Sequence, residues 1–227
     1  MTKKIIARVS CYLLGLSLLA LGLTLNTKAT LGVSPLIAFA YSASLIWGWN
    51  LGNTVFAWYC VFVLTEMLIH WQMGSEKRKQ RLLNDLLQIP LSLLFSRMMN
   101  FCGRWIPVFE TAFPDTFPAS IPGRILILIA AVFITGQGAA FTLNMRLIPN
   151  PGDGLVQSLA DFCHWKLGTA KNLFDMCCVL LTVLLSYLAT GRILGVGIGT
   201  LIAMLGTGRS IALFSRNVYP YLKPFVY

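Results

Sequence analysis

The sequence predicts an all-α polytopic membrane protein, and three observations predict it. Of the 227 residues, 56% are hydrophobic and only 11% are charged, whereas a soluble domain carries about 25% charged residues. Apolar segments of membrane-crossing length recur along the whole chain. The chain has 18 Lys and Arg but 8 Asp and Glu, and such an excess is typical of the loops that orient membrane helices.

Long apolar segments are each able to cross the hydrocarbon core as a helix. They cover residues 9–27, 52–72, 83–102, 123–147, 170–190 and 193–215. Two segments, 34–48 and 152–165, are short for a crossing and suit half-helices or re-entrant pieces. The first long segment ends without a good cleavage site, so we interpret it as an uncleaved helix rather than a signal peptide.

The two halves of the chain match each other without a gap over a short helix and its flanks, which predicts an internal repeat. The matched pairs are Gly22 with Gly138, Pro35 with Pro151, Trp49 with Trp165, and Leu51-Gly52 with Leu167-Gly168. Each repeat would contain a long helix, a short and possibly re-entrant helix, and two long helices. We expect a first membrane repeat over 1–102, a Pro/aromatic interfacial linker over 103–122, a second membrane repeat over 123–216 and an interfacial tail over 217–227.

The basic residues indicate how the helices are oriented. If the N-terminus is inside and the short segments do not cross, most Lys and Arg, including the dense group at 77–81, lie on the inner side. This favours six crossings, three per repeat, and therefore inverted-topology repeats, an arrangement common in secondary transporters. Eight full crossings remain the alternative. We expect a bacterial cytoplasmic (inner) membrane, with both termini cytoplasmic.

Each short segment begins with a proline-containing junction that is a candidate binding site. Ser34 precedes Pro35, and Asn150 precedes Pro151, Gly152, Asp153 and Gly154. Ser or Asn can cap a helix whose first turn accommodates proline, and the free N–H groups of that turn attract polar ligands. The alternative interpretation is an ordinary capped junction.

Charged residues in the second half form two further candidate groups. Asp153, Gln157, Asp161 and His164 share one face of the short helix, either as the wall of a cavity or as the wet face of an interfacial helix. Lys171 and Asp175 are four residues apart at the start of an apolar run, where a lone carboxylate is costly; the alternative is a surface ion pair. Glu66 is closer to the basic loop and is expected to snorkel or to pair with Lys77 or Arg78.

The sequence does not indicate catalysis or metal binding. The sequence presents no nucleophile–base–orienter set and no Cys/His cluster at metal-ligand spacing, and His70 and His164 are isolated along the chain. We therefore expect no enzyme, no metal, no cofactor and no nucleic-acid partner. The glycines of 195–200 lie between apolar helices, so they predict close helix packing or an unwound stretch lining a cavity rather than a nucleotide site.

These motifs resemble the YczE/YyaS group of bacterial inner-membrane proteins and, more distantly, the YitT group. Residues 150–155 are similar to that group's Gly-Pro-Arg-Asp-Gly-Leu, and residues 167–168 with Lys171 and Asp175 are similar to its Ile-Gly followed by a basic and an acidic residue. Residues 195–200 resemble its Gly-x-Gly-Thr segment. Two departures are that Leu36-Ile37 stands where the group has Trp-Asp, and Gly152 where it has Arg. The resemblance implies fold and location more than function.

The favoured hypothesis is a small secondary transporter or permease for a small polar or charged solute, with its site between the two repeats. Its predicted contacts are Ser34, Pro35, Asn150, Pro151, Gly152, Asp153, Gly154, Gln157, Lys171 and Asp175. The alternative is a non-transporting membrane protein that binds a lipid or a protein partner. The expected partners are the lipid bilayer and the solute, and a homodimer is compatible with the sequence.

Overall fold

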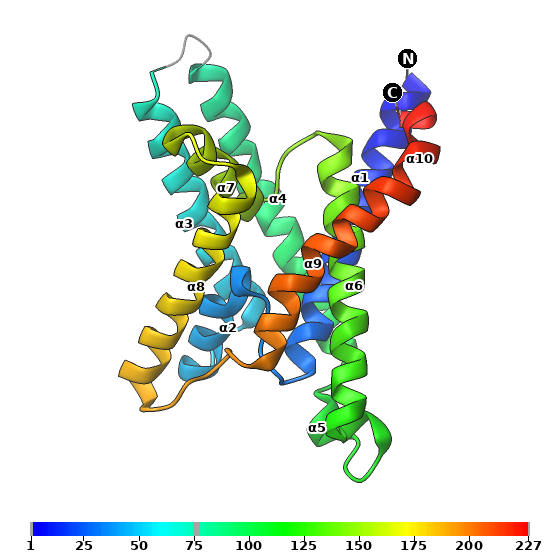
Figure 1. Ribbon diagram of the computed structural model, residues 1–227, viewed down its shortest axis with the longest axis vertical. Helices are drawn as coiled ribbons and strands as arrows, with labels where there is room; N and C mark the ends of the chain where they lie inside the picture. The colour runs from blue at the N-terminus through cyan, green and yellow to red at the C-terminus, as the bar shows by residue number, and fades with distance from the viewer. Residues whose placement is uncertain (1, 75–77, 227) are drawn as a thin grey trace. The chain divides into compact units, whose positions relative to one another are not determined.

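The computed structural model describes residues 2–74 and 78–226, and within these ranges the regular structure is helical throughout. This confirms the all-α class. The elements are α1 (Thr2–Lys28), α2 (Pro35–Trp47), α3 (Leu51–Gln72), α4 (Arg78–Trp105), α5 (Phe109–Ala112), η1 (Phe117–Ala119), α6 (Ile121–Met145), α7 (Pro151–Cys163), α8 (Leu167–Thr190), α9 (Ile198–Asn217) and α10 (Tyr219–Val226) (Figure 1).

Five of the described helices, α1, α3, α6, α8 and α9, are long and apolar enough to cross a membrane. Large apolar side chains on them are exposed, with Leu188 on α8 at 75%, as expected for helices solvated by lipid tails. α4 was expected to be a sixth crossing. Its 28 residues give sufficient length, but polar and charged residues interrupt its apolar ones, so it falls outside the apolar set.

The two short segments form short helices. α2 and α7 each have 13 residues and begin at Pro35 and Pro151. The helices that follow them begin at Leu51 and Leu167. These are the positions that the sequence comparison pairs, although the duplication itself stays a prediction.

The chain forms two compact units, each drawn from both halves of the sequence. Unit 1 comprises Met1–Ser34, Met98–Leu147 and Gly195–Tyr227. Its central contact is between α1 and α6, which run antiparallel, because Gly15 lies against Phe141 while Gly22 lies against Thr135. α9 begins later than predicted because the preceding glycine-rich segment is unwound, and Gly195 and Gly199 exchange backbone hydrogen bonds of 3.0 and 2.7 Å with the 31–33 loop.

Unit 2 comprises Pro35–Arg97 and Ile148–Leu194. It contains α2, α3, most of α4, α7 and α8. α7 packs on α3, and α2 packs on α8 (Figure 1). A Cβ atom at Gly152 would overlap the side chain of Leu36, so the first turns of the two short helices meet inside this unit.

Candidate functional site

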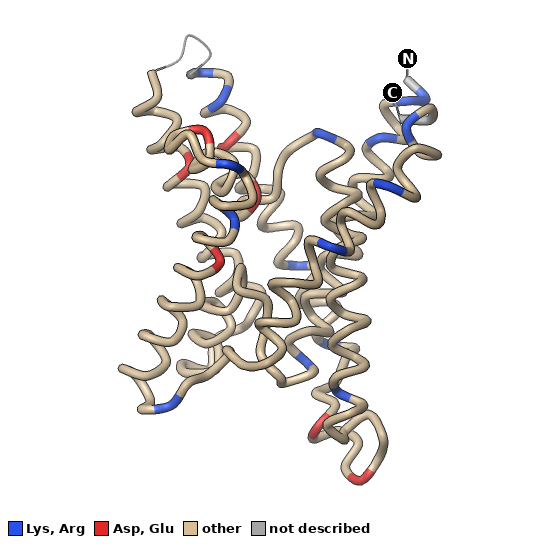
Figure 2. Tube along the Cα trace, in the orientation of Figure 1, with Lys and Arg blue, Asp and Glu red and all other residues tan. Residues whose placement is uncertain are grey.

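Unit 2 contains two groups of buried polar side chains, and α7 contributes to both. Acidic residues lie on α3, α4, α7 and α8 of this unit (Figure 2). We call one group the Tyr59 cluster, formed by Tyr59, Asn150, Asp153, Lys171 and Asp175. We call the other the His70 cluster, formed by Glu66, His70, Asp85, Gln88 and Ser158.

The Tyr59 cluster is centred on a buried phenol that has no hydrogen bond of standard geometry. Tyr59 is fully buried, and its hydroxyl makes no hydrogen bond within the described part of the chain. The Asn150 side chain lies beside it and Asp153 is within electrostatic range. An unpaired buried hydroxyl costs about 1–3 kcal/mol, and a bound polar ligand would relieve that cost.

An ion pair on α8 completes the Tyr59 cluster. Lys171 Nζ donates to Asp175 Oδ1 at 2.7 Å, and Asp175 is buried. Asp153 interacts electrostatically with both partners. With two carboxylates and one ammonium ionised, the cluster carries one excess negative charge. Lys171 also lies 5.9 Å from the centre of the Phe174 ring, so aromatic surface adjoins these charges.

The structure brings together several of the residues predicted from the sequence. Asn150 holds the N-cap position of α7, but its side chain makes no capping hydrogen bond; this corrects the expected capping role, and the side chain lies beside Tyr59 instead. Pro151 is in the first turn, as predicted. Asp153 is half-buried and joins Lys171 and Asp175.

Other predicted residues lie elsewhere. Gln157 is exposed and donates to Asp161 at 2.9 Å, so it belongs to the outer face of α7. Pro35 begins α2, next to the Leu36 that packs on Gly152. Gly154 faces the His70 cluster rather than the Tyr59 cluster. Ser34 belongs to unit 1.

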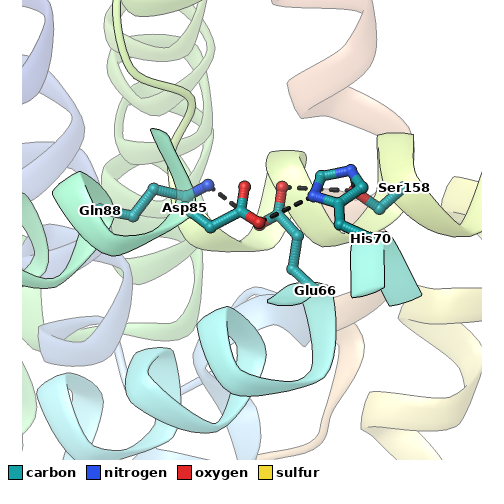
Figure 3. Close-up of polar contacts among 5 residues, drawn as sticks. All are labelled: Glu66, His70, Asp85, Gln88 and Ser158. Carbon is teal, nitrogen blue, oxygen red and sulfur yellow. Dashed lines mark hydrogen bonds and ion pairs between the residues drawn. The ribbon is translucent and has the colours of Figure 1, made fainter. Parts of the chain in front are cut away.

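The His70 cluster joins three helices (Figure 3). His70 Nδ1 lies 2.7 Å from Asp85 Oδ2, and its Nε2 lies 3.0 Å from Ser158 Oγ. Glu66 accepts a hydrogen bond from Gln88 Nε2 at 2.9 Å and another from Ser158 Oγ at 3.3 Å. Glu66, Asp85, Gln88 and Ser158 are all 3% exposed or less.

Sequence reasoning missed this cluster. The expectation that His70 is isolated is wrong, because Asp85 lies on another helix and reaches it across the α3–α4 contact. Glu66 was expected to pair with the basic loop, but Lys77 and the side chain of Arg78 lie outside the described residues, and Glu66 bonds to Gln88 and Ser158. The available signal was spacing: Glu66 and His70 are four residues apart, and Asp85 and Gln88 are three apart, so each pair shares a helix face.

Ser158, His70 and Asp85 have the connectivity of a nucleophile, a base and an orienting carboxylate, which the sequence did not predict. The surroundings do not favour hydrolysis. Glu66 Oε1 lies 3.3 Å from Ser158 Oγ, and a carboxylate there would oppose the negative charge of an acyl-transfer transition state. Ser158 also lies in the body of α7, where backbone N–H groups bond within the helix and are not free to stabilise an oxyanion.

The fold and the buried charges define a multi-pass helical membrane protein. The chain belongs to a family of unknown function, DUF6198, whose model matches residues 6–216. No curated protein and no solved structure matches the chain.

Proposed function

We propose that this protein is a small secondary transporter or permease of the bacterial inner membrane, and that the Tyr59 cluster binds its solute. The observation that carries the proposal is the unpaired, fully buried Tyr59 hydroxyl beside Asn150, Asp153 and the Lys171–Asp175 pair. Ionisable groups within membrane helices are costly and usually mark a solute or ion pathway.

The chemistry of the cluster favours a solute with a cationic group. When ionised, the two carboxylates of Asp153 and Asp175 outnumber the single Lys171 ammonium by one charge. Aromatic rings adjoin these groups. Carboxylates with aromatic faces are suited to ammonium groups. The Tyr59 hydroxyl and the Asn150 amide would hydrogen-bond a second polar group, so a small amine with a hydroxyl or carbonyl group is the expected class.

Two features support transport over a purely structural role. The cluster combines Tyr59 from the first half of the sequence with Asn150, Asp153 and Asp175 from the second, as in carriers whose sites lie between internal repeats. The first helices of the two halves, α1 and α6, run antiparallel, which is the relation that inverted repeats require. The resemblance to the YczE/YyaS group adds the expected inner-membrane location with cytoplasmic termini.

The test is uptake into proteoliposomes, with a panel of radiolabelled small amines and amino acids as probes. For any solute that wild type moves, Asp153→Asn and Tyr59→Phe should each reduce uptake about tenfold or more, since each removes a polar contact worth roughly 1.5 kcal/mol or more. Tyr59→Phe should leave the melting temperature unchanged or raise it, because it removes a buried hydroxyl that has no hydrogen bond of standard geometry.

Matched controls are Tyr187→Phe and Asp161→Asn, whose side chains are exposed. Both should transport like wild type. If Asp153→Asn and Tyr59→Phe transport like the controls, the site assignment fails. If wild type moves no probe across the panel, the permease assignment fails and the lipid- or partner-binding alternative takes its place.

A further inference from the structure

The His70 cluster lies outside the proposed solute site and has the composition of a metal site. Glu66 and His70 lie on one face of α3, and Asp85 reaches them from α4. The candidate ligand atoms of these three residues all lie within 4.8 Å of one another. Bonds of about 2.1 Å to a shared ion place ligand atoms roughly 3–4 Å apart, so small side-chain adjustments are sufficient to bind one.

With both carboxylates ionised, the charges in the cluster are unbalanced without a cation. Glu66 and Asp85 are 3% exposed, and ionised carboxylates at such depth are normally paired or coordinate metals. The hydrogen bonds described for Glu66 come from a neutral amide and a hydroxyl. Even if His70 is protonated, it neutralises only one of the two carboxylates. A divalent ion would balance both.

A second observation points to a bound ligand. The Gln88 side chain is fully buried, and its Oε1 has no hydrogen-bond donor within the described part of the chain. Its Nε2 already bonds to Glu66, so the amide adjoins the cluster, and its carbonyl oxygen is an unused donor of a lone pair. An oxygen of this type accepts a coordination bond or a metal-bound water.

The backbone of α7 lies close to the Glu66 carboxylate at Gly154. A Cβ atom at Gly154 would lie 2.7 and 2.9 Å from the two Glu66 carboxylate oxygens. Glycine therefore keeps α7 close to the carboxylate without covering it. Ser158, one turn further along, contributes a hydroxyl oxygen to the same place.

We propose that Glu66, His70 and Asp85 form a binding site for a divalent first-row transition metal, with Gln88 Oε1 as a further oxygen donor. One imidazole nitrogen with carboxylate oxygens suits Zn²⁺, Mn²⁺, Fe²⁺ or Co²⁺. Ca²⁺ prefers six to eight oxygen ligands and fits less well. The site would fasten α3 to α4 in unit 2.

The test uses the full chain in detergent micelles, purified through a tag that contains no histidine. Titration with Zn²⁺ and Co²⁺ should give about one equivalent bound. Glu66→Gln, Asp85→Asn and His70→Ala should each weaken the affinity about tenfold or more, the scale of losing an interaction at a metal site. Asp161→Asn removes an exposed carboxylate of α7 and should bind like wild type.

A spectroscopic readout keeps the test decisive if a cluster variant does not fold. The chain has two histidines, His70 and His164, and His164 is exposed. Pulsed EPR of bound Mn²⁺ should show coupling to an imidazole ¹⁴N in wild type and in His164→Ala. Absence of that coupling in wild type, or its loss in His164→Ala, overturns the proposal.

Two other outcomes also overturn it. One is equal metal affinity of wild type and all three cluster variants once size-exclusion chromatography shows that they are folded. The other is covalent labelling of Ser158 by a fluorophosphonate in a protein that binds no metal, which would identify the same residues as a hydrolase site. Neither result bears on solute uptake through the Tyr59 cluster, so this proposal and the proposed function fail separately.

Discussion

Each polar cluster contains a buried polar atom that has no hydrogen bond. Tyr59 and Gln88 hold such atoms, as do Asn26 and Trp58 elsewhere in the described part of the chain. Thr182 and Ser186 bond instead to the helix backbone. Unsatisfied groups cost free energy and need a reason to persist. A ligand at each cluster, as proposed above, would supply that reason.

The sequence predicted the charged members of the Tyr59 cluster but not its centre. Asp153, Lys171 and Asp175 were conspicuous because charges are rare in apolar segments. Tyr59 was not, since an aromatic residue in an apolar helix usually belongs to the core. His70 and Asp85 were missed because their contact joins two helices, and sequence spacing reports only the neighbours on one helix.

Glu110 in unit 1 gives a prediction about pH. Hydrogen bonds from Thr30 and Arg124, at 2.8 and 2.7 Å, lower the pKa of the Glu110 carboxyl below its ordinary value. A lowered pKa means that the stabilisation is present above the ordinary pKa and is lost as the pH falls through the folded-state value. Wild type should therefore exceed Glu110→Gln in stability near pH 7, and the difference should vanish in acid.

The measurement is the melting temperature of both proteins between pH 3 and pH 7. Because half of the Glu110 side chain is exposed, the difference at neutral pH should stay below about 1 kcal/mol. A difference that grows as the pH falls would contradict the assigned hydrogen bonds.

At the scale of elements, the starts of the short helices α2 and α7 were predicted more accurately than the apolar character of α4. Proline in the first turn is a strong local signal, and α2 and α7 begin at Pro35 and Pro151. α9 begins later than expected, because glycines interrupt the hydrophobic residues of 193–197, and Gly195 accepts a backbone hydrogen bond from Val33 in the 31–33 loop. α4 lies at the predicted position, but it is less apolar than predicted. Its polar residues Asp85 and Gln88 belong to the His70 cluster and do not face lipid.

The α1–α6 contact gives a prediction about packing. A Cβ atom at Gly138 would lie 2.7 Å from Gly15 O and 2.8 Å from Leu19 Cα, which are backbone atoms that cannot move unless the helix moves. Gly138→Ala should therefore destabilise the protein by about 1–3 kcal/mol. Close approach through small residues is a common way to pack membrane helices.

Gly208→Ala is the matched control, because nothing lies within 4 Å of a Cβ atom at that helical position. It should be neutral or stabilising by up to about 1 kcal/mol, since alanine favours helix. Thermal or denaturant unfolding in one detergent measures both variants. Equal stability of Gly138→Ala and Gly208→Ala would show that α1 and α6 do not pack through Gly138.

At the scale of the molecule, contiguous sequence halves and compact units are different divisions of the chain. The repeat predicted from the sequence separates 1–102 from 123–216, whereas each compact unit takes segments from both halves. The matched residues predict which helices are equivalent, but they carry no information about which helices pack together. Packing depends on complementary surfaces, such as Gly138 against Gly15 or Gly152 against Leu36.

The number of crossings is the whole-molecule property that the sequence left open, and two cysteine substitutions decide it. Lys79 lies in the first turn of α4 and Arg192 follows α8, and both are exposed. With α4 crossing and α2 and α7 not crossing, Lys79 is cytoplasmic and Arg192 external. We expect this arrangement, because α4 at 28 residues is about 42 Å long, whereas the 13 residues of α2 and α7 extend about 20 Å and fall short of the roughly 30 Å hydrocarbon core.

Each alternative predicts a different labelling pattern. In a variant with all six native cysteines replaced, Arg192→Cys should react with a membrane-impermeant maleimide on intact cells, and Lys79→Cys only after permeabilisation. If both react on intact cells, α2 and α7 cross fully and the chain has eight crossings. If neither does, α4 stays on one side and only the five apolar helices cross. Either alternative would run α1 and α6 in the same direction across the membrane, against their antiparallel contact, and the five-crossing outcome would also remove the three-plus-three relation on which inverted repeats depend. The labelling therefore tests the architecture behind the proposed transport site as well as the topology.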